Sequence, residues 1–339
     1  MGNPVGHTVK KEKTILIICS AIALMFTLLI MGLFMVYRKE LKDYFSNSVS
    51  CMTVPGISEG FIPQGLAYDS DTQAFFISGY MGNGKQSPVY VLREQDGIPV
   101  KRVDLLTEDG SKFKGHAGGV SVYGDGVFIA GSTQACVYYF PAGTLLNAEN
   151  GANQKAAERI SLRTEDDFIR ASFTSVDDSY LYIGEFHKGF VFYTHKSHLV
   201  EHDGIRQKAY LAGFRLSGNG QLVPACVFSI PDDVQGACFA QGHVFLSQSH
   251  GFLPSSILSY SLSGLEQAGT KRVLGQDVPL YVLSEHNATK KTKVPPMSEE
   301  ITVVDGNMYI LYEAAANRYR IGKKLGLDKI YATPLDYFL

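Results

Sequence analysis

The sequence has no tryptophan, no Cys-x-x-Cys pair and no complete catalytic motif among its 339 residues. A Gly-x-Ser-x-Gly nucleophile turn and an EF-hand calcium loop are both missing. The absence of tryptophan counts weakly against a sugar-binding site, because indole rings often serve as platforms for sugars. These absences leave the reaction, if there is one, without a sequence signature.

Charge is scarce and nearly balanced. Lysine and arginine total 31, aspartate and glutamate total 33, and charged residues make up 19% of the chain. Without a basic excess we expect no nucleic-acid partner, since phosphate binding needs a positive surface. The 20 phenylalanines and 19 tyrosines exclude a disordered chain. Together with 34 glycines they favour β structure rich in turns.

Cysteine is also sparse, with five residues. Four of them, Cys51, Cys136, Cys226 and Cys238, follow the apolar segment described next and allow three disulfide connectivities. The alternative interpretation treats Cys136, Cys226 and Cys238 as small buried hydrophobes, because they lie in strand-like runs. We favour the second interpretation.

Residues 14–37 contain no charged side chain. As a helix these 24 residues would extend about 36 Å, enough to cross a hydrocarbon core of about 30 Å. We predict a cytoplasmic tail at 1–13, a transmembrane signal-anchor at 14–37 and a stalk at 38–47. Three lysines precede the segment and three cations follow it, so the positive-inside rule does not decide its orientation. We favour a cytoplasmic N-terminus with the remaining domain, 48–339, outside the cytoplasm.

The rest of the chain contains five copies of a strand–turn–strand unit. Turns such as Asp305-Gly306 separate the two strands and indicate hairpins. The copies start 54, 54, 63 and 64 residues apart. The first strands are expected at 64–68, 118–122, 172–176, 235–239 and 299–303. The second strands are expected at 75–79, 127–131, 181–185, 244–248 and 308–313.

Further strands complete each unit. Third strands are expected at 88–92, 136–140, 256–260 and 329–332. In copy three both 190–193 and 209–216 qualify, and we prefer 209–216, which makes 195–208 an insert. Fourth strands are expected at 100–105, 158–162, 224–230 and 279–283. Copy five lacks one, and residues 48–54 are predicted to supply it. Four-stranded units without amphipathic helices predict an all-β fold, a five-bladed β-propeller preceded by one N-terminal transmembrane helix.

Three motifs carry a family resemblance. Ile62-Pro63-Gln64-Gly65-Leu66, the run 115–120 and the run 295–301 resemble propellers of the broad strictosidine-synthase, gluconolactonase and YncE-like group. More narrowly, the Pro-Pro-Met-Ser-Glu stretch and the Glu-x-Ala-Ala segment from Glu313 are similar to those of bacterial membrane-anchored propellers. The resemblance implies the fold over residues 57–335. It does not fix an activity, because the group includes enzymes and binding modules. Calcium-activated nucleotidases are similar in architecture alone.

In a propeller, the start of each first strand and the end of each second strand reach one face near the central channel. The predicted channel-face residues share this placement and a polar side chain, and they point to a binding site there. They are Gln64, His116, Arg170, Glu185, His187, Gln235, Gln248, His250, Glu299, Glu300 and Glu313.

Three interpretations of this face stay open. Its side chains can fill a polar channel by bonding one another, or bind a ligand without metal, with histidine and carboxylate available for acid–base chemistry. Carboxylate and amide oxygens also suit Ca²⁺, and Glu185, Glu299 and Glu313 with the amides Gln64 and Gln235 form the candidate ligand set. No cofactor other than Ca²⁺ is indicated.

Two motif matches are rejected. Residues 79–85 match the first seven positions of a phosphate-binding loop, but Gln86 stands where serine or threonine is required and a strand follows. Residues 198–202 match His-x-x-Glu-His, a zinc pattern that needs a helix. Their flanks leave no room for a long helix, so a solvated loop is expected, with adventitious zinc or nickel binding there. Lys290–Lys293 is interpreted as a solvated turn.

The sequence therefore predicts a membrane-anchored propeller outside the cytoplasm, a binding or interaction module whose small-molecule or protein partner occupies the channel face. The alternative is a calcium-dependent hydrolase of small esters, lactones or phosphoanhydrides.

Overall fold

The computed structural model describes residues 17–25, 27–28, 32, 35–37, 39–93, 101–217, 220–249, 251–319 and 322–339. The chain divides into two compact units between Ser46 and Asn47. In the first unit, residues 17–25 are helical and α2 spans Lys42–Asn47, reaching the boundary. Residues 14–16, 26, 29–31 and 33–34 of the predicted anchor lie outside the described residues. Within the described part of the chain, no helix combines the length and apolar character needed to span a membrane.

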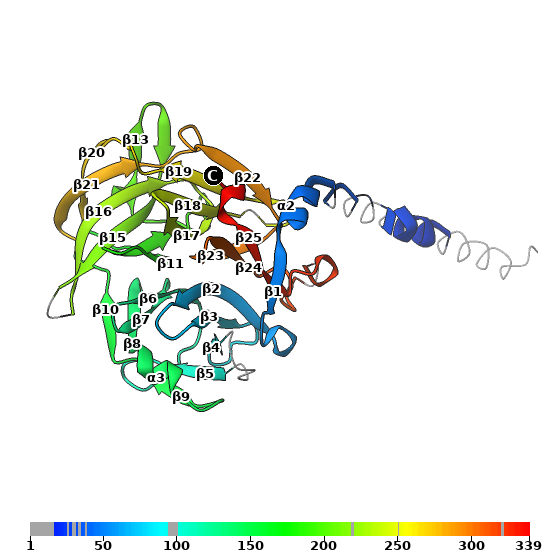
Figure 1. Ribbon diagram of the computed structural model, residues 1–339, viewed down its shortest axis with the longest axis horizontal. Helices are drawn as coiled ribbons and strands as arrows, with labels where there is room; N and C mark the ends of the chain where they lie inside the picture. The colour runs from blue at the N-terminus through cyan, green and yellow to red at the C-terminus, as the bar shows by residue number, and fades with distance from the viewer. Residues whose placement is uncertain are drawn as a thin grey trace, which may run out of the picture. The chain divides into compact units, whose positions relative to one another are not determined.

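The second unit is a five-bladed β-propeller (Figure 1). In each of its five main sheets an inner strand is followed outward by the second and third strands of the same repeat. Blade one contains β2 (Phe61–Asp69), β3 (Ala74–Met81), β4 (Pro88–Arg93), β5 (Lys101–Leu106) and the short parallel β9 (Asn153–Lys155). Blade two contains β6 (Ala117–Tyr123), β7 (Gly126–Gly131), β8 (Cys136–Pro141) and β10 (Glu158–Ser161).

Blades three to five follow the same pattern. Blade three contains β11 (Ala171–Val176), β12 (Leu181–Glu185), β15 (Ala209–Leu216) and β16 (Leu222–Ile230). Blade four contains β17 (Val234–Ala240), β18 (His243–Gln248), β19 (Ser255–Ser261) and β22 (Lys290–Val294). Blade five contains β23 (Ser298–Val304), β24 (Asn307–Tyr312), β25 (Lys329–Pro334) and β1 (Val49–Thr53). Short helices are α3 (Ala142–Leu146), η1 (Ile57–Glu59), η3 (Gly322–Leu325) and η4 (Leu335–Tyr337).

The inner strands β2, β6, β11, β17 and β23 form a closed ring. Each contacts the next in chain order, and β23 contacts β2 (Figure 1). The hairpin signals in the sequence have the expected geometry: Asp305-Gly306 and Gln241-Gly242 both adopt positive φ at each of their two positions. That conformation matches the twist of a two-residue hairpin turn, and glycine adopts it without steric cost.

Strand β1 completes blade five, as the sequence predicted. It pairs antiparallel with β25, and Val49 lies opposite Ala332. The ring is thus closed by segments from both ends of the described chain. The third-strand prediction for copy three is also confirmed, since β15 pairs with β12 while Phe190 and Val191 are exposed.

The fourth strand of copy four was predicted wrongly. Residues 276–282 form β21 (Gln276–Val282), which pairs in parallel with β16 of blade three and antiparallel with β20 (Gly269–Val273). Val278, Leu280 and Val282 pack into the core shared by blades two and three, which accounts for this crossover. The fourth strand of blade four is β22, so the interpretation of Lys290–Lys293 as a solvated turn is wrong. Thr292 and Val294 are buried in this strand, and Lys291 and Lys293 are exposed.

Apolar clusters lie between the packed strands of neighbouring blades. One joins Val89 and Val103 of blade one to Val127 and Ile129 of blade two. None of the five cysteines, all of them described, forms a disulfide. Cys136, Cys226 and Cys238 are buried, and burial raises the pKa of each of these thiols, as expected for small core residues.

Candidate functional site

A cavity of about 660 Å³ opens where the inner strands of the five blades begin. Each blade contributes a polar residue that the sequence had placed on this face. Gln64, Gln235 and Glu299 come from inner strands, His116 and Arg170 immediately precede two others, and Glu313 follows the second strand of blade five. The repeat therefore brings residues that are up to 249 positions apart into one cavity.

Two carboxyl groups form the acidic wall of this cavity, and each has a glutamine partner. Gln64 Nε2 donates to Glu313 Oε2 at 3.1 Å, and Gln235 Nε2 donates to Glu299 Oε1 at 3.3 Å. Burial raises the pKa of Glu313 to about 7, although Gln64, Tyr319 and Arg318 act in the opposite direction. Burial, followed by the charges of Glu313 and Glu300, raises the pKa of Glu299 well above its ordinary value. Both carboxyl groups therefore lose their protons at a higher pH than an exposed glutamate does.

Two tyrosines and an arginine that are not among the predicted channel-face residues border the same wall. The Tyr319 side chain hydrogen bonds Glu313, and Arg318 Nη1 donates to the Tyr80 hydroxyl at 3.4 Å. Tyr319 lies in the loop after β24, where Tyr319 N bonds Ala316 O at 2.8 Å. The repeat pattern does not reach this loop. Its one sequence signal is its position just after Glu313.

The opposite wall carries His116 and Arg170. Burial, with a smaller contribution from Arg170, lowers the pKa of His116 to about 4, so its imidazole is neutral at pH 7. Nδ1 of His116 is buried and has no hydrogen-bond partner among the described residues. The His116 ring lies 5.0 Å from that of Tyr80. Phe186, Phe252 and Met297 add apolar surface to the cavity.

Glu300 lies on the channel axis but not in the cavity. Its carboxylate accepts hydrogen bonds from Leu66 N at 3.3 Å, Val120 N at 3.0 Å and Thr174 N at 3.2 Å. These amides belong to the inner strands of blades one, two and three. A Cβ at Gly119 would lie 2.3 Å from Thr174 N and 2.8 Å from Glu300 Oε2, so the close approach of these strands requires glycine there. Glu300 thus ties four blades together.

Three other predicted residues are described and do not line the cavity. Glu185 follows Leu181 and Ile183 on one face of β12, and that face packs into the core between blades. It accepts bonds from Arg170 N, Tyr210 N and His198 Nδ1. His187 pairs with Asp232 at 2.8 Å. Gln248 donates to Asp232 O and Glu285 Oε1. His250 lies outside the described residues. Glu185 is therefore not available as one of the predicted calcium ligands in this cavity.

The His-x-x-Glu-His segment also differs from its prediction. The insert 195–208 contains η2 (Lys196–His198) and the hairpin β13 (Val200–His202) and β14 (Ile205–Gln207). His198 is fully buried rather than solvated, between Glu185 at 2.7 Å and Asp167 at 2.9 Å. Burial lowers the pKa of His198, but the two carboxylates outweigh it and raise the pKa to about 9.

The comparisons with known proteins do not identify a family for this chain. No protein-family model matches the chain, and no curated protein matches it. Among solved structures, a PQQ-bound aldose sugar dehydrogenase from Streptomyces coelicolor is 10% identical over 84% of this chain and 96% of its own, with a TM-score of 0.45. A GH43_1 enzyme from Xanthomonas citri complexed with xylose is 11% identical over 87% and 92%, with a TM-score of 0.44.

A glutaminyl cyclase from Myxococcus xanthus is 11% identical over 78% of this chain and 88% of its own, with a TM-score of 0.39. All three TM-scores are below 0.5, so these likenesses carry no argument about this chain. The assignment as a five-bladed propeller rests on the strand pairing itself.

Proposed function

We propose that the chain is a binding module that holds a small, amine-bearing polar molecule in the axial cavity. The observation that carries this proposal is the Glu299–Glu313 pair, two neighbouring carboxyl groups in a cavity of about 660 Å³, a volume suited to a small ligand. A cationic amine would offset the cost of ionising both carboxyl groups there.

The remaining walls fit the same class of ligand. Gln64 and Gln235 already orient the two carboxyl groups, so the acidic end is pre-organised. The ring of neutral His116 lines the cavity although its Nδ1 is buried, and Arg170 offers a positive charge for an anionic substituent. Phe186 and Phe252 supply apolar contact for a carbon skeleton. A small molecule with an amine at one end and a polar or anionic group at the other would therefore have a complementary partner for each of these groups.

The second candidate is a calcium-dependent hydrolase. The raised pKa values of Glu299 and Glu313 favour it, because a divalent cation can replace protons on a carboxyl pair. Oxygens of these two carboxyls and of Gln64 and Gln235 would be the ligands, with water for the remaining positions. Neutral His116 would then be the candidate general base.

One experiment separates these candidates. Purified full-length chain is screened by thermal shift and calorimetry against primary amines, amino acids and Ca²⁺, and by turnover of ester, lactone and nucleotide substrates. We expect an amine ligand to raise the melting temperature and Glu299→Gln or Glu313→Gln to abolish that shift. Glu201→Gln, on the exposed β13, is the matched control. Calcium binding with turnover, lost in the same variants, supports the hydrolase, whereas neither response in the wild type contradicts both.

For location, we propose that residues 14–37 anchor the chain in a membrane with the N-terminus cytoplasmic and the propeller outside. The uncharged run of 24 residues supports this proposal. We further propose kinship with the strictosidine-synthase, gluconolactonase and YncE-like propellers, on the motifs at 62–66, 115–120 and 295–301. Accessibility of Cys51 to an impermeant thiol reagent on intact cells tests the orientation, because this cysteine is exposed.

A further inference from the structure

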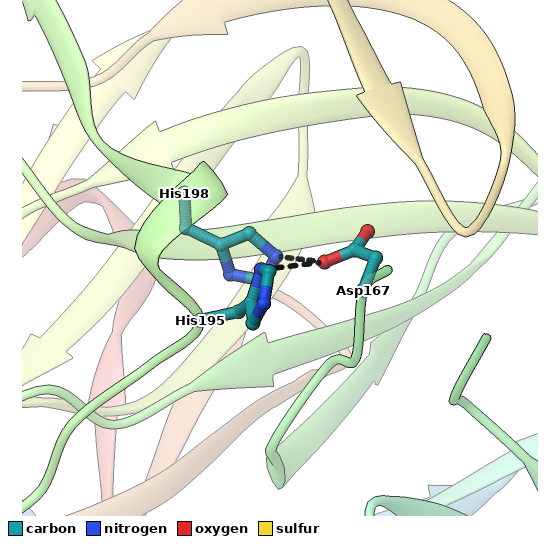
Figure 2. A group of neighbouring side chains, drawn as sticks. All are labelled: Asp167, His195 and His198. Carbon is teal, nitrogen blue, oxygen red and sulfur yellow. Dashed lines mark hydrogen bonds and ion pairs between the residues drawn. The ribbon is translucent and has the colours of Figure 1, made fainter. Parts of the chain in front are cut away.

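A cluster of nitrogen and oxygen donors lies outside the axial cavity, between the copy-three insert and blade three (Figure 2). His195 and His198 bracket the single turn η2, and Asp167 lies in the loop between β10 and β11. Figure 2 shows the two imidazole rings pointing at one carboxylate oxygen of Asp167. The three donor atoms lie within 4.8 Å of one another.

We propose that Asp167, His195 and His198 form a binding site for one divalent transition-metal ion, with Zn²⁺ the best fit. Two imidazoles and one carboxylate are a donor set that zinc accepts, whereas Ca²⁺ and Mg²⁺ prefer oxygen alone. This inference is independent of the function proposed for the axial cavity, because the two sites share no residue.

Two of the distances between the donors are close to those around a tetrahedral ion. Ligand atoms at about 2.0–2.1 Å from zinc lie roughly 3.3 Å apart. Asp167 Oδ1 lies 2.9 Å from His198 Nε2 and 3.4 Å from His195 Nδ1, and the two histidine nitrogens lie within 4.8 Å of each other. His195 Nδ1 also lies 2.7 Å from Ser197 Oγ, so an ion bound by the three donors would replace that contact.

The groups behind the donors hold them in place as they do in metal sites. His198 Nδ1 lies 2.7 Å from Glu185 Oε2, so Nε2 is the nitrogen that faces Asp167 Oδ1, and a bound ion would displace the proton between these two atoms. A carboxylate behind a ligating histidine fixes its tautomer and orientation. Glu185 is itself fixed by the backbone amides of Arg170 and Tyr210, and the Tyr210 ring stacks on His198 at 4.1 Å.

Asp167 is held on its other oxygen. Oδ2 accepts a hydrogen bond from Leu274 N at 3.0 Å, so Oδ1 is the oxygen that faces the histidines. A turn with Thr164 N bonded to Asp167 O at 2.8 Å fixes the backbone. The carboxylate thus reaches the cluster from a defined position, and a metal there would tie blade three, the insert and the β20–β21 hairpin together.

Two cavities adjoin the cluster. One of about 320 Å³ is lined by Asp167, Ser197 and Arg272, and one of about 500 Å³ is lined by His195. Three protein ligands leave one tetrahedral position, which water can occupy. The second histidine of the rejected sequence motif, His202, lies on β13 and pairs with Asp203 at 3.4 Å, so the proposed site combines His198 with His195 instead.

The test uses the tag-free, metal-depleted chain. Zinc binding is measured by calorimetry, and a parallel titration with Co²⁺ is followed by the visible absorption that is typical of tetrahedral Co²⁺. We expect one strongly bound equivalent with a tetrahedral Co²⁺ spectrum. His195→Ala, which removes a partly exposed ligand, should weaken zinc binding by more than about tenfold. His202→Ala is the matched control and should bind as the wild type does.

Asp167→Asn provides a second variant with the same expected loss, and circular dichroism establishes that each variant is folded. The proposal is overturned if the wild type binds no stoichiometric zinc, or if His195→Ala and Asp167→Asn bind as the wild type does. It is also overturned if His202→Ala reduces binding as strongly as His195→Ala, since the ion would then lie elsewhere on the insert. Failure here leaves the axial-cavity proposal unaffected, because its variants are Glu299→Gln and Glu313→Gln.

Discussion

At the scale of single residues, the axial cavity concentrates carboxyl groups whose protonation is shifted towards neutrality. Glu299, Glu300 and Glu313 all have raised pKa values, and burial is the largest cause for each. The unfolded chain would hold these groups at their ordinary values near 4.5. Folding therefore takes up protons above that pH, which couples the stability of the propeller to pH.

The first prediction concerns this coupling. Because the folded pKa of Glu313 is about 7, the folded state binds more protons than the unfolded state between about pH 4.5 and 7. Stability should therefore fall as pH rises through this window. Glu313→Gln should reduce the fall by roughly 1–2 kcal/mol, allowing for partial solvent screening. Urea unfolding at about pH 5 and about pH 8 measures it. An unchanged pH slope in Glu313→Gln, with Glu201→Gln as control, would contradict the assignment.

The sequence pattern predicts only in part which polar residues reach the cavity. Gln64, Gln235 and Glu299 lie on inner strands, whose position next to the axis follows from the repeat. Glu185 and Gln248 end second strands, where alternation decides the face. Both share a face with buried apolar residues two positions earlier, Ile183 and Leu246. That alternation was visible in the sequence, whereas the path of the Tyr319 loop was not.

At the scale of elements, β23 acts as the connector of the ring through Glu300. Three backbone amides from three other inner strands converge on its carboxylate, and the side chain is 1% exposed. Burial raises the pKa of this carboxyl group, and the three amide donors act in the opposite direction by stabilising its charged form. Removing it would leave those donors without an acceptor in a dry interior, and such groups are costly to bury.

The second prediction follows for this contact. Glu300→Ala should lower the free energy of unfolding by about 3–5 kcal/mol, because three buried amides lose their acceptor together. Glu300→Gln keeps a carbonyl oxygen of the same shape and should cost less than half as much. Chemical denaturation of both variants at neutral pH measures the difference. Equal losses for alanine and glutamine would mean that the side-chain volume, rather than hydrogen-bond acceptance, stabilises the ring.

The elements themselves were largely predictable, and the exceptions have physical reasons. Paired turn residues and alternating apolar runs located the hairpins β17–β18 and β23–β24. The segment predicted as the fourth strand of blade four lies in β21, which pairs with blade three, and β22 takes its place in blade four. The apolar alternation of 276–282 fits a neighbouring blade as well as its own. Local pattern does not specify which sheet a peripheral strand joins, since that choice depends on packing between repeats. The lysine-rich β22 showed too weak a pattern to be recognised as a strand.

At the scale of the whole molecule, the propeller depends on its closure. The pairing of β1 with β25 joins residues from both ends of the described chain, and the β1 side chains are mostly exposed. Closure by this strand therefore rests on backbone hydrogen bonds more than on buried surface. Without β1, strand β25 would become an open sheet edge, which invites pairing with another chain.

The last prediction tests closure directly. A chain that begins at Val54 lacks β1, while a chain that begins at Asn47 keeps it and serves as the control. We expect loss of β1 to lower the free energy of unfolding by roughly 2–4 kcal/mol, at about 1 kcal/mol for each net backbone hydrogen bond. Light scattering should show concentration-dependent association of the shorter chain through the β25 edge. The axial cavity lies on the inner strands, so ligand binding should survive in the fraction that stays folded and monomeric. Equal stability and equal solubility of the two chains would show that β1 is an accessory strand and that the other four blades hold blade five in place.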